Sequence, residues 1–209
     1  CQAFTAIGQV IDDNVYEYNS DFDLLIVVKN KKMEEDFGVW DAIESECYKQ
    51  GVRTWISLIV DNIHDVNEQL ALGRYFYSEV KKEGVLLYDA GNYELAEPRI
   101  LTENEKKDLA KQDYDYWFSS ANYFLDDCRE NLKKGRLSNA AFNLHQAVER
   151  FVAALLLVYT GYRPKTHDLK SLMERAQEVD PDIWKVFFAG VDAMEERRLF
   201  ELLRRAYVD

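Results

Sequence analysis

The hydrophobic periodicity of the chain changes once, near its midpoint, and this change most limits the folds open to it. In the first half, runs with a period of two alternate with runs of helical period, which is typical of strands and helices in turn. Beyond Thr102 every apolar stripe has the helical period. We therefore predict an α+β protein with a small mixed sheet in an α/β domain at residues 1–90, a linker at 91–101 and an antiparallel four-helix bundle at 102–209.

The first half contains signals for three strands and two helices. Apolar, β-branched and aromatic runs predict strands at residues 24–28, 53–60 and 85–88. Apolar residues at helical spacing predict helices at about residues 37–47 and 66–80. No strand is recognised before the first of these, so the predicted sheet has three strands.

The second half carries clear signals for helix ends. Thr102 and Glu105 have the spacing of a capping box, which marks a helix start. Gly135 and Gly161 each follow a long apolar stripe and predict helix ends, and Pro164 lies just beyond the second. Two further helices follow, which completes the predicted bundle.

Two acids stand one residue apart at the mouth of the first predicted strand, in the segment Ser20-Asp21-Phe22-Asp23. Side chains alternate along a strand, so Asp21 and Asp23 are expected on the same face. Paired carboxylates suit a divalent cation such as Mg²⁺, which usually shares its ligand shell with phosphate oxygens. The chemistry indicated is nucleotidyl transfer, and the alternative is a pair of solvated acids at a strand entrance.

The charge of the chain is acidic and uneven. The formal net charge is −12; residues 1–99 hold 9 Lys and Arg against 19 Asp and Glu, a net of −10, which leaves −2 for residues 100–209. A charge of this sign does not attract nucleic acid through its mean field. The imbalance indicates two different modules.

The cysteines and the apolar runs indicate a cytoplasmic protein. Cys1, Cys47 and Cys128 are scattered in dissimilar contexts, which favours reduced thiols over disulfides or a zinc site. The longest nearly uninterrupted apolar run, residues 151–159, is shorter than the roughly 20 residues of a membrane span. No signal peptide is recognised at the start. We predict no membrane partner.

Taken together, these segments resemble a minimal nucleotidyltransferase domain fused to a HEPN domain. The front motif, residues 20–24, is similar to the first family's Ser-Asp-x-Asp-Leu. Three rear segments carry the likeness to HEPN domains: AAFNLHQAVER at residues 140–150, RPKTHDL at 163–169 and LLRRAY at 202–207.

The resemblance implies an activity and partners. Asp21 and Asp23 would each ligate Mg²⁺, which would hold the triphosphate of ATP, and Ser20 would donate to a phosphate oxygen. A nucleotidyl group would pass to a protein or to a small hydroxyl acceptor. The likeness also implies toxin–antitoxin biology or stress defence, a homodimer formed through the helical domain, and RNA or a toxin or antitoxin as partner.

The front half departs from the nucleotidyltransferase pattern in two ways. No Gly-Ser pair precedes Ser20, and we expect the chain to be truncated at both ends, beginning and ending inside its two domains. The family's third acid is expected closest to Ser57, with Asp61 as the only substitute metal ligand. These departures support an alternative, a degenerate nucleotide-binding or regulatory module.

The rear half departs from the ribonuclease pattern. HEPN ribonucleases pair an Arg with a His at a longer spacing than the three residues between Arg163 and His167. Ribonuclease activity is therefore not supported by the residues present, although a helical RNA-binding or RNA-cleaving domain restrained by the front half is a third hypothesis. For His145 and for His167 a structural role is favoured over catalysis.

Overall fold

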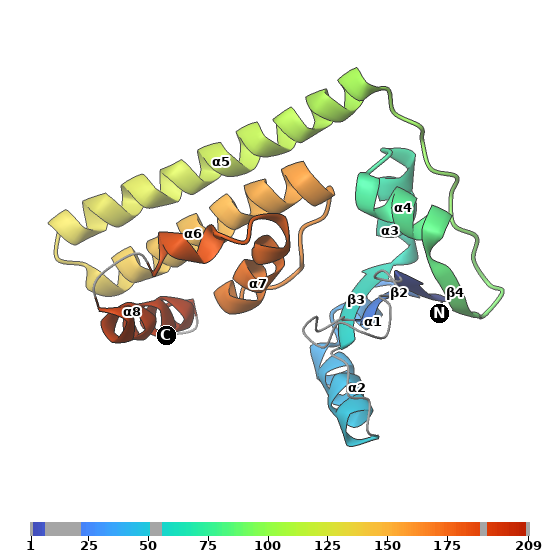
Figure 1. Cartoon of the computed structure of the whole chain (residues 1–209), viewed down its shortest axis with the longest axis horizontal. Helices are drawn as coiled ribbons and strands as arrows, with labels where there is room; N and C mark the ends of the chain where they lie inside the picture. Colours follow the sequence, from blue (N-terminus) through green and yellow to red (C-terminus); the bar gives the residue numbers. More distant parts are fainter. Residues whose placement is uncertain (1, 7–21, 51–55, 189–191, 208–209) are drawn as a thin grey trace, which may run out of the picture. The chain divides into compact units, whose positions relative to one another are not determined.

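The chain consists of two compact units, Cys1–Ile100 and Leu101–Asp209. The structure is a computed structural model, and it describes residues 2–6, 22–50, 56–188 and 192–207. Within these ranges the strands lie in the first unit, and the second is helical (Figure 1). The predicted α+β class, with a small mixed sheet followed by a helical region, is confirmed.

The first unit interleaves strands and helices along the chain. Its elements are β1 (Gln2–Ala6), β2 (Phe22–Val28), α1 (Lys31–Glu34), α2 (Phe37–Lys49), β3 (Ile56–Asn62), α3 (Ile63–Ala71), α4 (Tyr75–Glu83) and β4 (Val85–Asp89). The strand order is β3-β2-β1-β4. Strand β1 is antiparallel to both of its neighbours, whereas β2 and β3 are parallel, so the sheet is mixed.

Strand β1 corrects the expectation that no strand precedes residue 24. Its sequence QAFTA contains Gln, Thr and two Ala, so it has little of the apolar pattern by which strands are recognised. It pairs with β2 on one side and with β4 on the other. Backbone hydrogen bonds to β2 and β4 therefore hold β1 in the sheet, although its sequence gives no strand signal.

The core of the first unit lies where α3 and α4 pack against the sheet. Val66 and Leu70 on α3 are fully buried, one helical turn apart, and α3 packs against β2 and β3. The segment after β4 returns across these helices: the Lys81 ammonium donates to the carbonyls of Leu95 and Ala96 at 3.2 and 2.9 Å. This contact fastens the segment after β4 to α4.

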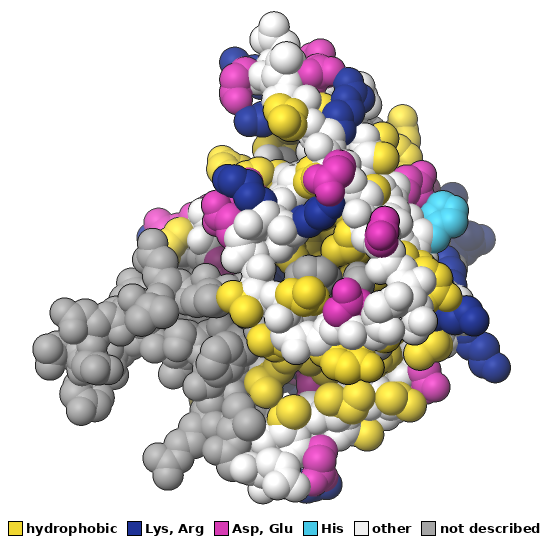
Figure 2. All heavy atoms as spheres, turned by 90° about the vertical axis from the view of Figure 1, so that its right-hand side faces the viewer, with side chains coloured by type: hydrophobic (Ala, Val, Ile, Leu, Met, Phe, Trp, Pro, Cys, Tyr) yellow, Lys and Arg dark blue, Asp and Glu magenta, His cyan; other side chains and the backbone are white. Residues whose placement is uncertain are grey.

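Strand β4 is a sheet edge with an unusual surface. All five of its residues are exposed, including the apolar run of residues 85–88. The face drawn in Figure 2 shows hydrophobic side chains together with acidic and basic ones.

The second unit is built on a helical hairpin. Its elements are α5 (Glu103–Lys133), α6 (Leu137–Thr160), α7 (Leu169–Val179), the short 3₁₀ helix η1 (Ile183–Val186) and α8 (Ala193–Arg205). The capping box is present: Thr102 Oγ1 accepts from the Glu105 backbone N–H at 3.3 Å, and Glu105 accepts from the Thr102 backbone N–H at 2.9 Å. Gly161 ends α6 in the left-handed conformation, with φ of 66°, as the sequence predicts.

Helix α6 is the central element of this unit. It lies along α5 and also packs on α7 and α8 (Figure 1). Small buried residues, among them Ala121 on α5 and Ala147 and Ala153 on α6, allow the helices to approach closely. Among the described residues, α6 is the one helix long and apolar enough to cross a membrane by length and composition. Of its apolar stretch, 44% is buried inside the protein.

A second apolar cluster joins the remaining helices to α6. It contains Val152 and Leu156 from α6, Leu172 and Met173 from α7, and Phe200 from α8. Aromatic rings around Phe200 close this cluster on the side of the 3₁₀ helix. The cluster holds α7 and α8 against the second half of α6.

Candidate functional site

One acid of the sequence motif, Asp23, stands at the start of β2. Ser20 and Asp21 lie outside the described residues, whereas Asp23 is the second residue of the strand and is partly buried. Its Cα partner on the parallel strand β3 is Ser57. The position beside Asp23 at which a further acid would help to hold a cation is therefore occupied by a serine, whose hydroxyl is a weak Mg²⁺ ligand.

Asp61, the predicted substitute ligand, is not brought to this end of the sheet. Its Cα partner is Val27, four residues beyond Asp23, which is about 13 Å along a strand. Two oxygens on one Mg²⁺ lie at most about 4 Å apart, because each bond is about 2.1 Å long. Asp61 and Asp23 therefore do not converge on one cation. Counting along the predicted strand identified Asp61 as a candidate. Its position relative to Asp23 is known only from the pairing register of β2 and β3.

Asp61 instead belongs to a buried polar group where β3 runs into α3. Its side chain is 0% exposed, and Oδ2 accepts from the Tyr77 hydroxyl at 2.8 Å. Beside it, Glu34 Oε2 accepts from the backbone N–H and the side-chain amide of Asn62 at 3.1 and 2.6 Å. Asn62 in turn caps α3 by accepting from the Asp65 backbone N–H. These contacts join α1, β3, α3 and α4.

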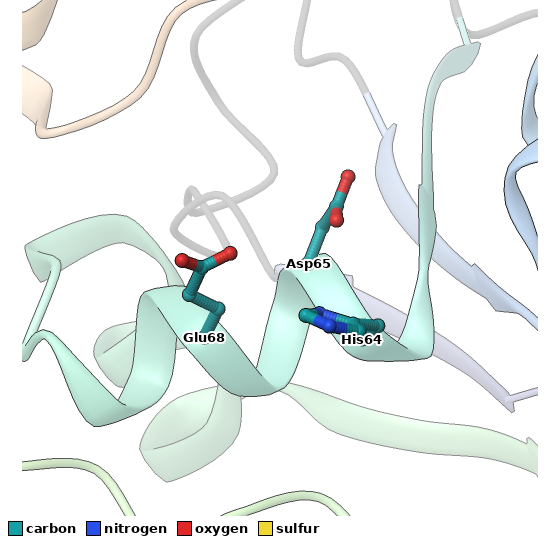
Figure 3. A group of neighbouring side chains, drawn as sticks. All are labelled: His64, Asp65 and Glu68. Carbon is teal, nitrogen blue, oxygen red and sulfur yellow. The ribbon is translucent and has the colours of Figure 1, made fainter.

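Three potential metal ligands lie together on the first turns of α3. Figure 3 shows His64, Asp65 and Glu68, whose ligand atoms all lie within 4.8 Å of one another. His64 and Glu68 are exposed. Acids at a helix N-terminus are favoured by the helix dipole without any ion, so their position does not call for a metal, and we assign none.

The second unit contains a denser polar cluster, centred on Glu149 of α6. This carboxylate is buried, with 3% exposure, and Oε2 accepts from His167 Nδ1 at 3.0 Å. Arg163 Nη1 lies 3.7 Å from Oε1, and His145 Nε2 lies 4.0 Å from Oε2. One buried carboxylate is therefore surrounded by two imidazoles and a guanidinium.

His145 ties α6 to two other segments. The ring is fully buried; Nδ1 lies 2.9 Å from the Leu203 carbonyl oxygen on α8, and Nε2 lies 3.1 Å from the His167 carbonyl oxygen. A carbonyl oxygen only accepts, so both contacts are hydrogen bonds when the ring carries two N–H groups. The preference for a structural role at this position agrees with the geometry.

Asp168 locks α7 to α8 next to this cluster. Its carboxylate caps α7 by accepting from the Ser171 N–H at 3.0 Å, and it accepts from Arg204 Nε and Nη2 at 3.0 and 2.9 Å. Partial burial raises the pKa of Asp168, but the hydrogen bonds from Ser171 and Arg204 outweigh burial and hold the pKa below its usual value. The same carboxylate and Glu201 outweigh the effect of burial on Arg204 and raise the pKa of its guanidinium.

Aromatic rings complete the surroundings of the cluster. Tyr207 stacks on the His167 ring, with centroids 4.5 Å apart and an interplanar angle of 16°. The guanidinium carbon of Arg163 lies 4.9 Å from the centre of the Trp117 ring, and that of Arg150 lies 5.5 Å from the same centre. Such contacts orient cations by the ring quadrupole. Arg150 and Trp117 were not recognised as partners in the sequence, because they lie on different helices.

The three rear segments that resemble HEPN domains meet at this one place. The first supplies His145 and Glu149, the second Arg163 and His167, and the third Tyr207. Segments separate in the sequence thus share one polar cluster beside the middle of α6. Hydrogen bonds in this cluster join α6 to α8 and to the loop before α7.

Residues 114–209 match the family model described as HEPN domain, so the second unit carries a HEPN domain. No curated protein matches the chain. The HEPN half of the resemblance is thereby supported, and the nucleotidyltransferase half remains a proposal.

Proposed function

We propose that this protein is a regulatory module in which the first unit binds a magnesium–nucleotide complex through Asp21 and Asp23. The pairing of Asp23 with Ser57 supports this proposal best, because two carboxylates and a serine suit nucleotide binding better than the three carboxylates of a full transferase. Mg²⁺ bound there would neutralise triphosphate charge. The HEPN domain would carry the contacts to partners.

Nucleotidyl transfer is the second candidate, favoured by the similarity of residues 20–24 to the transferase motif. In this case ATP is the substrate, Asp21 and Asp23 hold the metal, and Ser20 donates a hydrogen bond to a phosphate oxygen. The acceptor is a protein or a small molecule with a hydroxyl group. Asp23 is partly buried at a strand start, a position compatible with a cation that also contacts a large ligand.

Titration with ATP and magnesium tests both candidates. We expect the wild-type chain to bind Mg-ATP, and Asp21→Asn/Asp23→Asn to bind it at least about tenfold more weakly, because charge-assisted ligation is lost. Asp126→Asn/Asp127→Asn on α5 makes the same change of charge at exposed positions and should bind like wild type.

The outcome also separates the two candidates. Binding without transfer of a labelled nucleotide supports the regulatory module, and transfer to an added acceptor supports the enzyme. A wild-type chain that binds no Mg-ATP contradicts both.

For the HEPN domain we propose a homodimer formed through the helical unit, with RNA or a toxin or antitoxin protein as a further partner in stress defence. HEPN domains commonly dimerise, and α5 exposes large aromatic residues such as Tyr116 and Tyr123 that suit an interface. Sedimentation velocity over a range of concentrations measures the dimer. A monomer at every concentration contradicts it, and incubation with labelled RNA tests the RNA partner.

A further inference from the structure

The chain between β4 and α5 is held on the surface of the first unit. Residues 90–101 lie within the described part of the chain and form no helix or strand. Leu95, Ala96 and Pro98 in this segment are nevertheless partly buried. We call residues 94–99 the strap, because side chains and a carbonyl group of α3 and α4 bind its backbone.

Two contacts with the strap come from α3. The Asn67 side-chain amide donates to the Glu94 carbonyl at 3.2 Å, and its oxygen accepts from the Ala96 backbone N–H at 2.7 Å. Further along, the Arg99 backbone N–H donates to the Leu70 carbonyl in the last turn of the helix at 2.9 Å. These hydrogen bonds use backbone groups of the strap, so they do not depend on its side chains.

Lys81 holds the strap from α4. Its ammonium lies 3.2 Å from the Leu95 carbonyl oxygen, 2.9 Å from that of Ala96 and 2.7 Å from Glu97 Oε1. An ammonium has three N–H donors, so these three acceptors match its capacity. The Lys81 side chain is 21% exposed and that of Glu97 is 90% exposed. Because an exposed ion pair contributes little, we attribute most of the attachment to the two carbonyls.

The strap leaves only a short connection to the helical unit. Arg99 is bonded to α3 and Thr102 caps α5, so residues 100–101 alone lie between them. Three Cα–Cα steps span at most about 11 Å. At the other end of the segment Gly91 turns the chain away from β4, with φ of 68° and its N–H donating to Asp89 Oδ1 at 2.7 Å. Without the strap contacts, the chain from this turn to α5 would span at most about 40 Å.

We propose that the strap is a releasable attachment that sets the length of free chain between the two units. Its hydrogen bonds come from surface side chains and one helix end, not from a sheet, so it opens while the core of the first unit stays folded. A longer free connection lowers the effective concentration of one unit near the other. Lys81 and Asn67 thereby regulate how far the HEPN domain reaches, independently of the nucleotide site proposed at Asp21 and Asp23.

Hydrogen exchange of single amides, followed by nuclear magnetic resonance in the full chain, tests whether the strap opens by itself. The N–H groups of Ala96 and Arg99 donate to α3 and report on the strap. The N–H groups of β2 report on the whole unit, because this strand is paired on both sides. We expect the two strap amides to be protected, but to exchange at least about a hundredfold faster than those of β2.

Variants of the two helices identify what holds the strap. Lys81→Met keeps an unbranched side chain but removes the donors, and it should speed exchange of both strap amides by about tenfold or more. Asn67→Ala should do the same from α3. Lys82→Met changes the neighbouring exposed lysine and should have no effect. Glu97→Gln should change the rates less than Lys81→Met, because the bonds to the strap backbone remain. The β2 amides report whether each variant stays folded, and if Lys81→Met disturbs them, Asn67→Ala decides.

Small-angle X-ray scattering measures the consequence for the whole chain. The double variant Lys81→Met/Asn67→Ala should have a radius of gyration larger than that of wild type by a few ångströms, because the free connection is longer. Wild type, the double variant and Lys82→Met are compared at one concentration, with the oligomeric state checked by sedimentation velocity. Lys82→Met should match wild type.

Three results would overturn the proposal. These are equal exchange of the strap and of β2, wild-type exchange of the strap in both Lys81→Met and Asn67→Ala, and an unchanged radius of gyration in the double variant. Equal exchange would mean that the strap opens only when the whole unit unfolds. Asp21→Asn/Asp23→Asn should leave exchange of the strap unchanged, and Lys81→Met should still bind Mg-ATP. Failure of the strap proposal is therefore distinguishable from failure of the function proposed for the first unit.

Discussion

Each unit buries acids, but their partners differ. In the first unit the Tyr77 phenol bonds Asp61 and the Asn62 amide bonds Glu34. In the HEPN domain Glu149 is bonded by an imidazole and lies beside a guanidinium. The first arrangement joins neighbouring elements through neutral donors. The second gathers a guanidinium and two imidazoles from distant parts of the chain around one carboxylate.

The largest expected effect comes from Glu149→Gln. Removing a buried carboxylate that faces cationic partners typically costs about 3 kcal/mol or more of the free energy of unfolding. Urea unfolding followed by far-UV circular dichroism measures it. The matched control Glu130→Gln, at an exposed ion pair with Lys133, should leave the free energy of unfolding nearly unchanged. Equal costs would mean that the cluster does not stabilise the domain.

Tyr77→Phe should weaken the first unit alone. The substitution leaves the buried Asp61 carboxylate without the phenol, at a cost of about 2 kcal/mol. Hydrogen exchange measured by mass spectrometry should show faster exchange in peptides from β3 and α4 and unchanged exchange in α6. Tyr75→Phe changes an exposed tyrosine on the same helix and should have no effect. Faster exchange in α6 would show that the two units are coupled.

Asp168→Asn should have the smallest effect. It keeps a capping oxygen for α7 but loses the charge that faces Arg204, and partial exposure limits the cost to about 1 kcal/mol at neutral pH. Because the pKa of Asp168 is lowered in the folded state, its stabilisation is complete above the unfolded value of about 3.9 and is lost as the pH falls through the folded value.

Unfolding of wild type and variant across this range of pH measures that effect. The difference should be constant above about pH 5 and should shrink below about pH 4. The exposed Asp115→Asn is the control. A difference that grows as the pH falls would contradict the lowered pKa.

Much of the fold was predictable because its signals are local. The capping box at Thr102 and the glycine at position 161 act within a few residues, and the structure has both where the sequence indicates them. Strand β1 was missed because its residues carry little apolar pattern and its place depends on two distant partners. Helix α1 was also missed, since four residues are too few for a periodic signal.

The candidate sites were predictable only in part. The sequence singled out Asp21, Asp23 and Asp61 as acids, and it drew attention to His145 and His167. It did not reveal that Asp61 and Asp23 lie far apart, because their distance depends on the pairing register of the parallel strands β2 and β3. Nor did it associate Glu149 with His167, which is 18 residues away and reaches it only after the chain turns at the end of α6.

The sequence by itself determined the two-part architecture, the helix ends and the HEPN-like segments, because periodicity, capping and motif spacing are properties of short stretches of chain. Only the tertiary structure decided which side chains meet. The buried bonds of Asp61 and the cationic groups around Glu149 depend on contacts between distant elements, and their geometry is fixed by packing of the whole unit. Side-chain type supplied the candidates, and the fold selected which of them share a site.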